Sequence, residues 1–366
     1  MRDGWVEYKF KDVAIAVKGK LPKSKNEDGI GVPYLTASYL RSNQPDYWIE
    51  DLEGALTAED GDCLILWDGA GAGDLFSARR GVVSSTMAVV TTQNSKILRE
   101  FLTLFISSKA EYIKETCRGT TVPHVSPDAI ANMELKIPPL PEQKRIVDLI
   151  SSVDSYIEAL QQQLESAKRS RNAVLHELLT SVGDDWEESS LGQLLTLEYG
   201  KPLTDENRDG RGFPVFASAG IVGMHSEPLV SISPVIVVGR KGTAGAVYWS
   251  ETPCFVIDTA YFVKQISDVD SRFLYLLLSF IDLKNVTAQT GVPGLNRERA
   301  YSLKCNVPPK STQLEIVSLI SLFEGEIARS VRVIEEAKQL RSALMSDLLS
   351  GSHEIPTSYD KVIGVA

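Results

Sequence analysis

Two stretches of the chain carry apolar or small residues at alternating spacings of four and three, from Ile146 to Leu178 and from Ile316 to Leu348. In the first stretch only Arg171 breaks this character. The pattern persists over more than four heptads and is typical of a coiled coil. It predicts two helices of about 40 residues, each roughly 60 Å long at 1.5 Å per residue.

Local signals predict where these helices begin and end. Pro141 and Glu142 suit a first helical turn, and Thr312 to Glu315 has the form of a capping box. Gly183 and Gly351 are expected to close the two C-terminal ends.

The segments before each long helix have a different pattern. Short β-rich runs, such as Cys63 to Trp67 and Val235 to Val238, are each followed by a glycine-rich loop. Arg99 to Ile113 and Ser271 to Asp282 are predicted to be helices. This mixture favours an α+β fold over regular βαβ alternation.

The chain also repeats itself at about half its length. The segment Thr120-Thr121-Val122-Pro123 matches Thr290-Gly291-Val292-Pro293, and Gln143 matches Gln313 at the same offset. Two α/β domains in tandem pseudo-repeat, each followed by a long helix, are therefore predicted. The expected boundaries are 1–140 and 184–310 for the domains, 141–183 and 311–351 for the helices, and 352–366 for a tail.

The two heptad stretches occupy equivalent points of the repeat, which favours pairing within one chain over homodimerisation. Two helices related by a pseudo-two-fold axis run antiparallel. We therefore expect an antiparallel intramolecular coiled coil.

Composition limits the possible classes of protein. The net charge is −10, so the chain does not coat nucleic acid by bulk charge, and any DNA contact needs basic residues gathered on one surface. The four cysteines are scattered and are expected to be reduced thiols. No apolar run approaches the roughly 20 residues that span a bilayer, so a cytoplasmic location without membrane contact is expected.

Enzyme motifs are weak. Asp68 to Gly73 follows a strand and is similar to the glycine loop of S-adenosylmethionine-binding folds, but strand-like sequence follows it instead of a helix. The equivalent loop of the second copy, Gly239 to Gly245, is basic and lacks P-loop spacing. The four histidines have no metal-ligand spacing, so no catalytic residue and no metal ligand is predicted.

One family shares the junction between domain and helix. Val122-Pro123-His124-Val125, followed by Leu135 to Gln143 and then Ile146-Val147, resembles the signature of the specificity subunits of type I restriction–modification systems. Its recurrence half a chain later makes the resemblance specific, although the second junction lacks the Leu-Pro-Glu of the first.

The resemblance implies a non-catalytic subunit whose two target-recognition domains each recognise one half of a bipartite sequence in double-stranded DNA. It implies two methyltransferase subunits docked along the helices, and restriction subunits that translocate DNA. S-adenosylmethionine would then belong to the methyltransferase, and ATP with Mg to the restriction subunit, with no cofactor on this chain.

Candidate DNA contacts are polar and basic residues of loops in the two copies, because Arg and Lys bind guanine or phosphate and Asn recognises adenine. In the first copy they are Lys20, Thr36, Ser38, Asp68, Arg79, Arg80, Thr120, Thr121 and His124. In the second they are Lys201, Ser218, His225, Arg240, Lys241, Thr243, Thr290, Asn296 and Arg297. The basic pairs Arg79-Arg80 and Arg240-Lys241 are the strongest of these candidates.

Three alternatives stay open at this point. The first is the specificity subunit of a type IIB-like restriction system, in which cleavage and methylation share one partner chain. The second is an S-adenosylmethionine-dependent methyltransferase that uses Gly69 to Gly73. The third is a coiled-coil adaptor with no DNA role.

Overall fold

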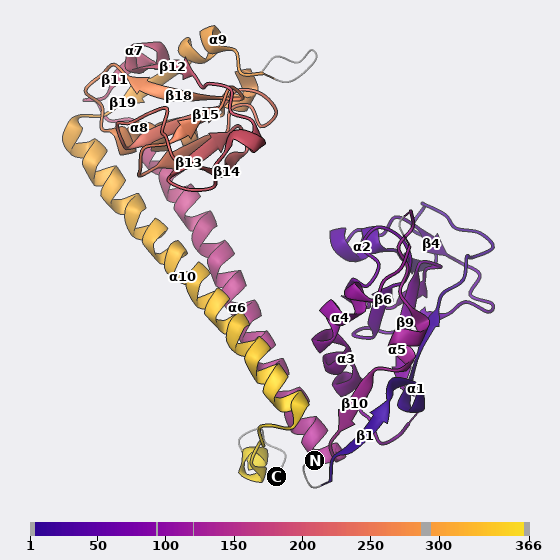
Figure 1. Ribbon diagram of the computed structural model, residues 1–366. Coiled ribbons are helices and arrows are strands. Elements are labelled where there is room, and N and C mark those ends of the chain that lie inside the picture. Colours follow the sequence, from indigo (N-terminus) through magenta and orange to yellow (C-terminus); the bar gives the residue numbers. More distant parts are fainter. Residues whose placement is uncertain (1–3, 93, 120, 287–293, 362–366) are drawn as a thin grey trace. The chain divides into compact units, whose positions relative to one another are not determined.

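A computed structural model describes residues 4–92, 94–119, 121–286 and 294–361 (Figure 1). The chain divides into two compact units. Unit 1 comprises Met1–Leu160 and Val333–Ala366, and unit 2 comprises Gln161–Arg332. Each unit therefore contains one α/β domain together with one half of each long helix.

The α/β domain of unit 1 contains three sheets. A four-stranded antiparallel sheet has the order β2-β9-β6-β7, a second has the order β4-β3-β8-β5 with β3 and β8 parallel, and β1 pairs with β10. The strands are β1 (Val6–Lys9), β2 (Ala14–Lys18), β3 (Val32–Leu35), β4 (Trp48–Ile49), β5 (Thr57–Ala58), β6 (Cys63–Leu66), β7 (Leu75–Ser77), β8 (Gly81–Val83), β9 (Met87–Thr92) and β10 (Glu134–Ile137).

Unit 2 repeats this topology. The sheet β12-β18-β15-β16 corresponds to β2-β9-β6-β7, β13 pairs in parallel with β17 as β3 does with β8, and β11 pairs with β19. The strands are β11 (Glu187–Ser190), β12 (Leu195–Tyr199), β13 (Phe213–Ala217), β14 (Gly220–His225), β15 (Val235–Gly239), β16 (Val247–Ser250), β17 (Phe255–Val256), β18 (Ala260–Gln265) and β19 (Lys304–Val307).

Short helices cover these sheets. Unit 1 has α1 (Phe10–Val13), α2 (Ala37–Ser42), α3 (Arg99–Ser108), α4 (Ala110–Glu115) and α5 (Pro127–Ala131). Unit 2 has α7 (Leu191–Leu194), α8 (Ser271–Phe280) and α9 (Arg297–Tyr301), with 3₁₀ turns at Asp205–Asn207 and Leu283–Val286. A last 3₁₀ turn, Thr357–Lys361, ends the described chain.

The helix predicted from Arg99 to Ile113 is two helices, because Lys109 adopts φ −103° and ψ 12° between α3 and α4. The Ser107 and Ser108 hydroxyls donate to the carbonyl oxygens of Thr103 and Phe105 just before this break. Such side-chain bonds to the backbone compete with regular helix geometry.

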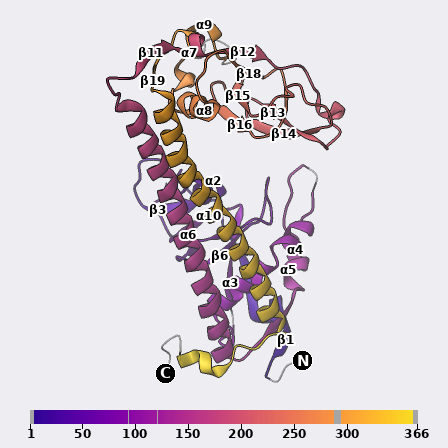
Figure 2. The same ribbon diagram turned by 90° about the vertical axis from the view of Figure 1, so that its left-hand side faces the viewer.

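The two long helices are α6 (Leu140–Thr180) and α10 (Lys310–Ser350), each of 41 residues, and they lie side by side and antiparallel (Figures 1 and 2). The heptad positions face the partner helix: Ile146, Ile150 and Ile157 are buried in unit 1, and Ile316 and Ile320 are buried in unit 2. The predicted α+β class with an antiparallel intramolecular pair of long helices is confirmed.

Two predictions about the helix ends are wrong. Thr312 lies inside the first turn of α10, which begins at Lys310, so it does not cap the helix. Gly183 lies beyond the end of α6 and does not adopt a positive φ, whereas Gly351 follows α10 directly with φ +76°.

Gly351 packs against Trp5, since a Cβ on this glycine would lie 3.4 Å from the indole ring. Ile355 belongs to the same buried cluster as Trp5, so the segment after α10 joins the core of unit 1.

The repeated glutamine has a structural role in both units. Gln143 is fully buried; its Nε2 donates to Pro138 O at 2.8 Å and to Lys96 O at 2.7 Å, and its Oε1 accepts from Leu98 N at 2.8 Å. Gln313 repeats this pattern with Pro308 O at 2.8 Å and Asp270 N at 2.7 Å. Each glutamine thus ties the start of a long helix to the segment that begins α3 or α8.

We expect Gln143→Ala to lower the free energy of unfolding of unit 1 by about 2–4 kcal/mol, because a buried amide proton and two buried carbonyl oxygens lose their partner. The matched control is Gln44→Ala at an exposed position of unit 1, which should change it by less than about 0.5 kcal/mol. Hydrogen exchange of peptides from residues 96–108 measures the effect. Equal protection in both variants would contradict the role assigned to Gln143.

Candidate nucleic-acid interface

Aromatic and basic side chains lie together at one edge of the four-stranded sheet in unit 2, where β12 and β15 end and β18 begins. Tyr199 ends β12 and pairs with Tyr261 at the start of β18, which in turn pairs with Val238 near the end of β15. The segment that follows β15 carries Arg240, so these residues meet at one place. Tyr199 is half exposed, whereas Tyr261 is buried, and burial raises the pKa of its phenol.

Arg240 and Arg297 stack on this tyrosine pair. The Arg240 guanidinium carbon lies 4.9 Å from the Tyr199 ring centroid and 5.9 Å from that of Tyr261. The corresponding distances for Arg297 are 4.6 and 5.9 Å. Such cation–π contacts hold a guanidinium plane in one orientation without neutralising its charge. We call Tyr199, Tyr261, Arg240 and Arg297 the Arg–Tyr cluster.

Backbone carbonyl groups fix the position of both arginines further. Arg240 Nη1 donates to Asp258 O at 2.8 Å, and Arg297 Nη1 donates to Leu197 O at 3.3 Å. In the described part of the chain, no carboxylate forms an ion pair with either arginine. Each guanidinium therefore retains its positive charge and its Nε and Nη2 donors for an external acceptor.

Several predicted contact residues of the second copy surround the Arg–Tyr cluster. Lys241 and Thr243 are exposed in the loop after β15, and Ser218 Oγ lies beside the same loop, because a Cβ on Gly242 would be 3.5 Å from it. Lys201 follows shortly after β12 and is exposed. Asn296 caps α9 by accepting from Arg299 N at 3.0 Å, so its side chain positions the helix that carries Arg297.

The equivalent edge of unit 1 has different chemistry. Lys18 ends β2, as Tyr199 ends β12. After β6, Trp67 and Asp68 both donate their backbone N–H to Thr86 O, as Arg240 and Lys241 after β15 donate to Thr259 O, so Asp68 occupies the position of Lys241. Lys18 and Asp68 form an ion pair. His124 forms isolated backbone bridges with Asp68 and Arg118, and Thr121 is exposed in the same loop. Lys20 is exposed shortly after β2.

The remaining predicted residues of unit 1 lie on other elements, of which α2 adjoins the loop after β6 through the Arg41–Asp74 ion pair. Thr36 caps α2 by accepting from Tyr39 N, and its hydroxyl donates to Asp46; Ser38 lies on α2. Arg79 and Arg80 are exposed beyond β7, at the end of the sheet opposite Asp68, since Ser77 pairs with Cys63.

His225 belongs to β14, in the other sheet of unit 2, with its ring edge-to-face on Phe255 at 5.7 Å. Thr120 and Thr290 lie outside the described residues. Every predicted DNA contact stays a prediction.

Sequence reasoning missed Tyr199, Tyr261 and Lys18. All three lie at strand ends and show only as β-pattern residues in the sequence. When the two copies are aligned strand by strand, Lys18 at the end of β2 occupies the position of Tyr199 at the end of β12. This match between the copies is the signal that points to these two residues.

The glycine loop of unit 1 has a structural explanation. Asp68 to Gly73 connects β6 to β7, which pair antiparallel, so no helix N-terminus follows the loop to accept a cofactor phosphate. Asp74 closes the loop through Lys114 at 3.1 Å and Arg41 at 2.6 Å, and the Lys114 hydrogen bond is the main cause that lowers the pKa of Asp74.

Other reactive groups are poor candidates for chemistry. Burial raises the pKa of Cys63 to about 12 and those of Cys254 and Cys305 to about 11, so these thiols stay protonated. Within the described ranges, no group of three His, Cys, Asp or Glu residues is arranged to hold a metal ion. None of the helices formed by the described residues is long and apolar enough to cross a membrane.

Two domains of one topology, each joined to one of two antiparallel long helices, define a tandem-repeat α+β protein. The model of the type I restriction modification DNA specificity domain matches the chain twice, over residues 2–169 and 183–339. The chain belongs to this family and is a type I restriction–modification specificity subunit.

Individual relatives agree with this assignment. The chain is 22% identical to the type I restriction enzyme MjaVIII specificity subunit of Methanocaldococcus jannaschii, over 95% of this chain and 93% of that protein. It is 25% identical to the EcoBI specificity subunit of Escherichia coli over 56% of this chain and 48% of that protein. The crystal structure of the type I S subunit from M. genitalium shares the fold, with a TM-score of 0.58 at 16% identity, covering 94% of this chain and 96% of that chain.

Proposed function

We propose that this chain is the non-catalytic DNA sequence-specificity subunit of a type I complex, in which each α/β domain recognises one half of a bipartite site in the major groove. The observation that carries this proposal is the repeated sheet edge. The two copies place loop residues of different chemistry at equivalent positions of one topology, which suits two domains that recognise different half-sites.

The long helices serve two purposes in this proposal. They dock two methyltransferase subunits, and they set the number of unrecognised base pairs between the half-sites. Restriction subunits are further partners in the same complex. S-adenosylmethionine, ATP and Mg are held by these partners, and this chain supplies recognition alone.

The chemistry of the Arg–Tyr cluster suits the second half-site. A fixed guanidinium fork matches the O6 and N7 acceptors of guanine or two phosphate oxygens. The tyrosine rings supply that orientation in advance, so less side-chain entropy is lost when DNA binds. Because the net charge of the chain is −10, we expect the isolated chain to bind DNA weakly and the methyltransferase subunits to add cationic surface.

Mapping adenine methylation tests the function. The chain is expressed with the methyltransferase encoded beside it in a host free of adenine methylation, and N6-methyladenine is located by single-molecule sequencing. We expect a two-part motif that disappears when the chain is omitted. Replacing residues 185–310 by those of a relative should change only one half of the motif. Methylation that is absent, or unchanged without this chain, would refute the proposal.

A further inference from the structure

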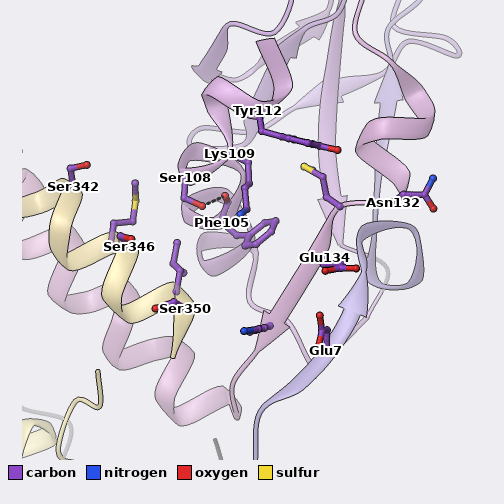
Figure 3. Close-up of a pocket in the computed structure, with 14 residues that line it drawn as sticks. Glu7, Phe105, Ser108, Lys109, Tyr112, Asn132, Glu134, Ser342, Ser346 and Ser350 are labelled. Atoms are coloured by element: carbon purple, nitrogen blue, oxygen red, sulfur yellow. Dashed lines mark hydrogen bonds between the residues drawn. The ribbon is translucent and has the colours of Figure 1, made fainter. Parts of the chain in front are cut away.

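A cleft of about 740 Å³ opens in unit 1 between the last turns of α10, the junction of α3 and α4, and the β1–β10 pair (Figure 3). Ser346 lies on the α10 side of this cleft and Ser108 on the α3 side. The volume is within the range of cavities that hold a ligand or a peptide segment. None of the DNA-contact candidates lies in this cleft.

The internal repeat identifies the residues of unit 2 that are equivalent to those lining the cleft in unit 1. Helices α3 and α8 are equally long, and each buries a phenylalanine completely at its third position, Phe101 and Phe273. This alignment matches Ser108 to Phe280. The constant offset between the long helices, which relates Gln143 to Gln313, matches His176 to Ser346.

In unit 2 these two positions are filled by rings in contact. His176 and Phe280 pack edge-to-face, with ring centroids 5.5 Å apart and an interplanar angle of 68°. The same two positions in unit 1 carry serines, so the space between the helices is left open. The second copy therefore contains, within its own chain, the aromatic pair that the first copy lacks.

The walls of the cleft suit an aromatic guest. Phe105, Met133 and Leu349 are buried and supply an apolar base, with Met345 and Tyr112 beside them. Aromatic side chains pack favourably against ring edges and methionine sulfur. Along α10, Ser342, Ser346 and Ser350 recur at every fourth position, so one ridge of small side chains lets a second backbone approach the helix closely (Figure 3).

Charges of both signs line the cleft. Glu7 and Glu134 come from β1 and β10, and Lys109 and Lys136 come from the α3–α4 junction and β10. This mixture suits a polypeptide, with its alternating donors and acceptors, better than a polyanion. The volume also exceeds what one side chain fills, so the segment that carries the aromatic residue has to enter with it.

We propose that this cleft receives an aromatic side chain, on a short segment of the methyltransferase subunit, and that only the first copy offers this anchor. The inference rests on the proposed function, since it names a contact within that complex. Two identical methyltransferase subunits then meet chemically different surfaces on the two halves of this chain. The subunit on unit 1 gains an anchoring side chain that the subunit on unit 2 lacks.

Filling the cleft with the pair from the second copy is the direct test. Ser108→Phe combined with Ser346→His should fold, because the equivalent helices of unit 2 accommodate the same two residues. We expect affinity for the methyltransferase encoded beside the chain to fall at least about tenfold at one of its two binding sites, as followed by native mass spectrometry over a concentration series. The control is Ser279→Phe with Ser318→His, which adds the same residues at exposed positions of unit 2.

Undiminished binding of the methyltransferase to the filled variant would overturn the inference and leave the proposed function intact. If the unaltered chain binds no methyltransferase, the proposed function and the inference fail together. A change in the oligomeric state of the isolated filled variant would assign the cleft to a second copy of this chain instead.

Hydrogen exchange of the unaltered protein gives a second measurement that needs no variant. Residues 105–112 and 342–350 should gain protection when the methyltransferase binds, and unchanged exchange there would equally overturn the inference.

Discussion

Replacing Arg240 by alanine is expected to weaken binding of the assembled complex to its specific DNA by about 5- to 160-fold, because one bidentate contact to a base discriminates by about 1–3 kcal/mol. Only the half of the motif assigned to unit 2 should become degenerate in the methylation map. Arg297→Ala should act on the same half, since both arginines stack on Tyr199 and Tyr261.

Arg240→Lys separates recognition of a base from attraction to phosphate. Lysine keeps the charge but lacks the planar fork, so a guanine contact is lost, whereas a phosphate contact largely survives. Arg211→Ala is the matched control, because this exposed arginine of unit 2 lies outside the Arg–Tyr cluster and its loss removes the same charge. If Arg240→Ala and Arg211→Ala weaken binding equally and leave the motif intact, Arg240 contributes only general electrostatic attraction.

The predictable part of the fold follows from periodicity and repetition. Heptad spacing predicted both long helices, and the fixed offset between matching segments predicted two copies, because both signals extend over much of the chain. Both helix starts were predicted to within one residue, but the cap of the second helix was not. Thr312 to Glu315 has the form of a capping box, but Gln313 is used for tertiary hydrogen bonds to Pro308 and Asp270, and the helix begins earlier.

The candidate interface was less predictable than the fold. Arg240 and Arg297 are far apart in the sequence, and only the pairing of β12, β18 and β15 brings them to the same two tyrosines. A tyrosine at a strand end looks like an ordinary β residue in the sequence. Arg79 and Arg80 illustrate the converse, because two adjacent arginines attract attention in the sequence while the strand pairing puts them at the other end of the sheet from Asp68.

Arg171, the charged residue that interrupts the heptad pattern of α6, forms an ion pair with α10. Arg171 pairs with Glu324 at 2.8 Å in unit 2, and in unit 1 Arg341 pairs with Asp154. The offset that relates Gln143 to Gln313 also relates Asp154 to Glu324 and Arg171 to Arg341, so the two ion pairs are copies of one another. The step forward on α6 from Asp154 to Arg171 equals the step back on α10 from Arg341 to Glu324, as antiparallel pairing in constant register requires.

The two copies differ in their surroundings, and this difference predicts unequal effects of charge reversal. Glu324 also accepts from Arg272 at 2.5 Å, and Arg171 is only 14% exposed, whereas Asp154 is 44% exposed. We expect Arg171→Glu to destabilise the helix pair of unit 2 by about 3 kcal/mol, because it leaves poorly hydrated charges of like sign together. Arg341→Asp should cost unit 1 about 1 kcal/mol, as for an exposed pair.

Exchanging the two charges of each ion pair tests whether the pair acts alone or together with a further charged residue. Asp154→Arg combined with Arg341→Asp should recover the stability of unit 1, because the reversed pair keeps its attraction. Glu324→Arg combined with Arg171→Glu should not recover that of unit 2, since the new arginine then faces Arg272. Hydrogen exchange of α6 peptides from residues 145–160 and 165–180 measures the two units separately. Full recovery in unit 2 would show that Arg272 contributes nothing, and that the helix register depends on two independent ion pairs.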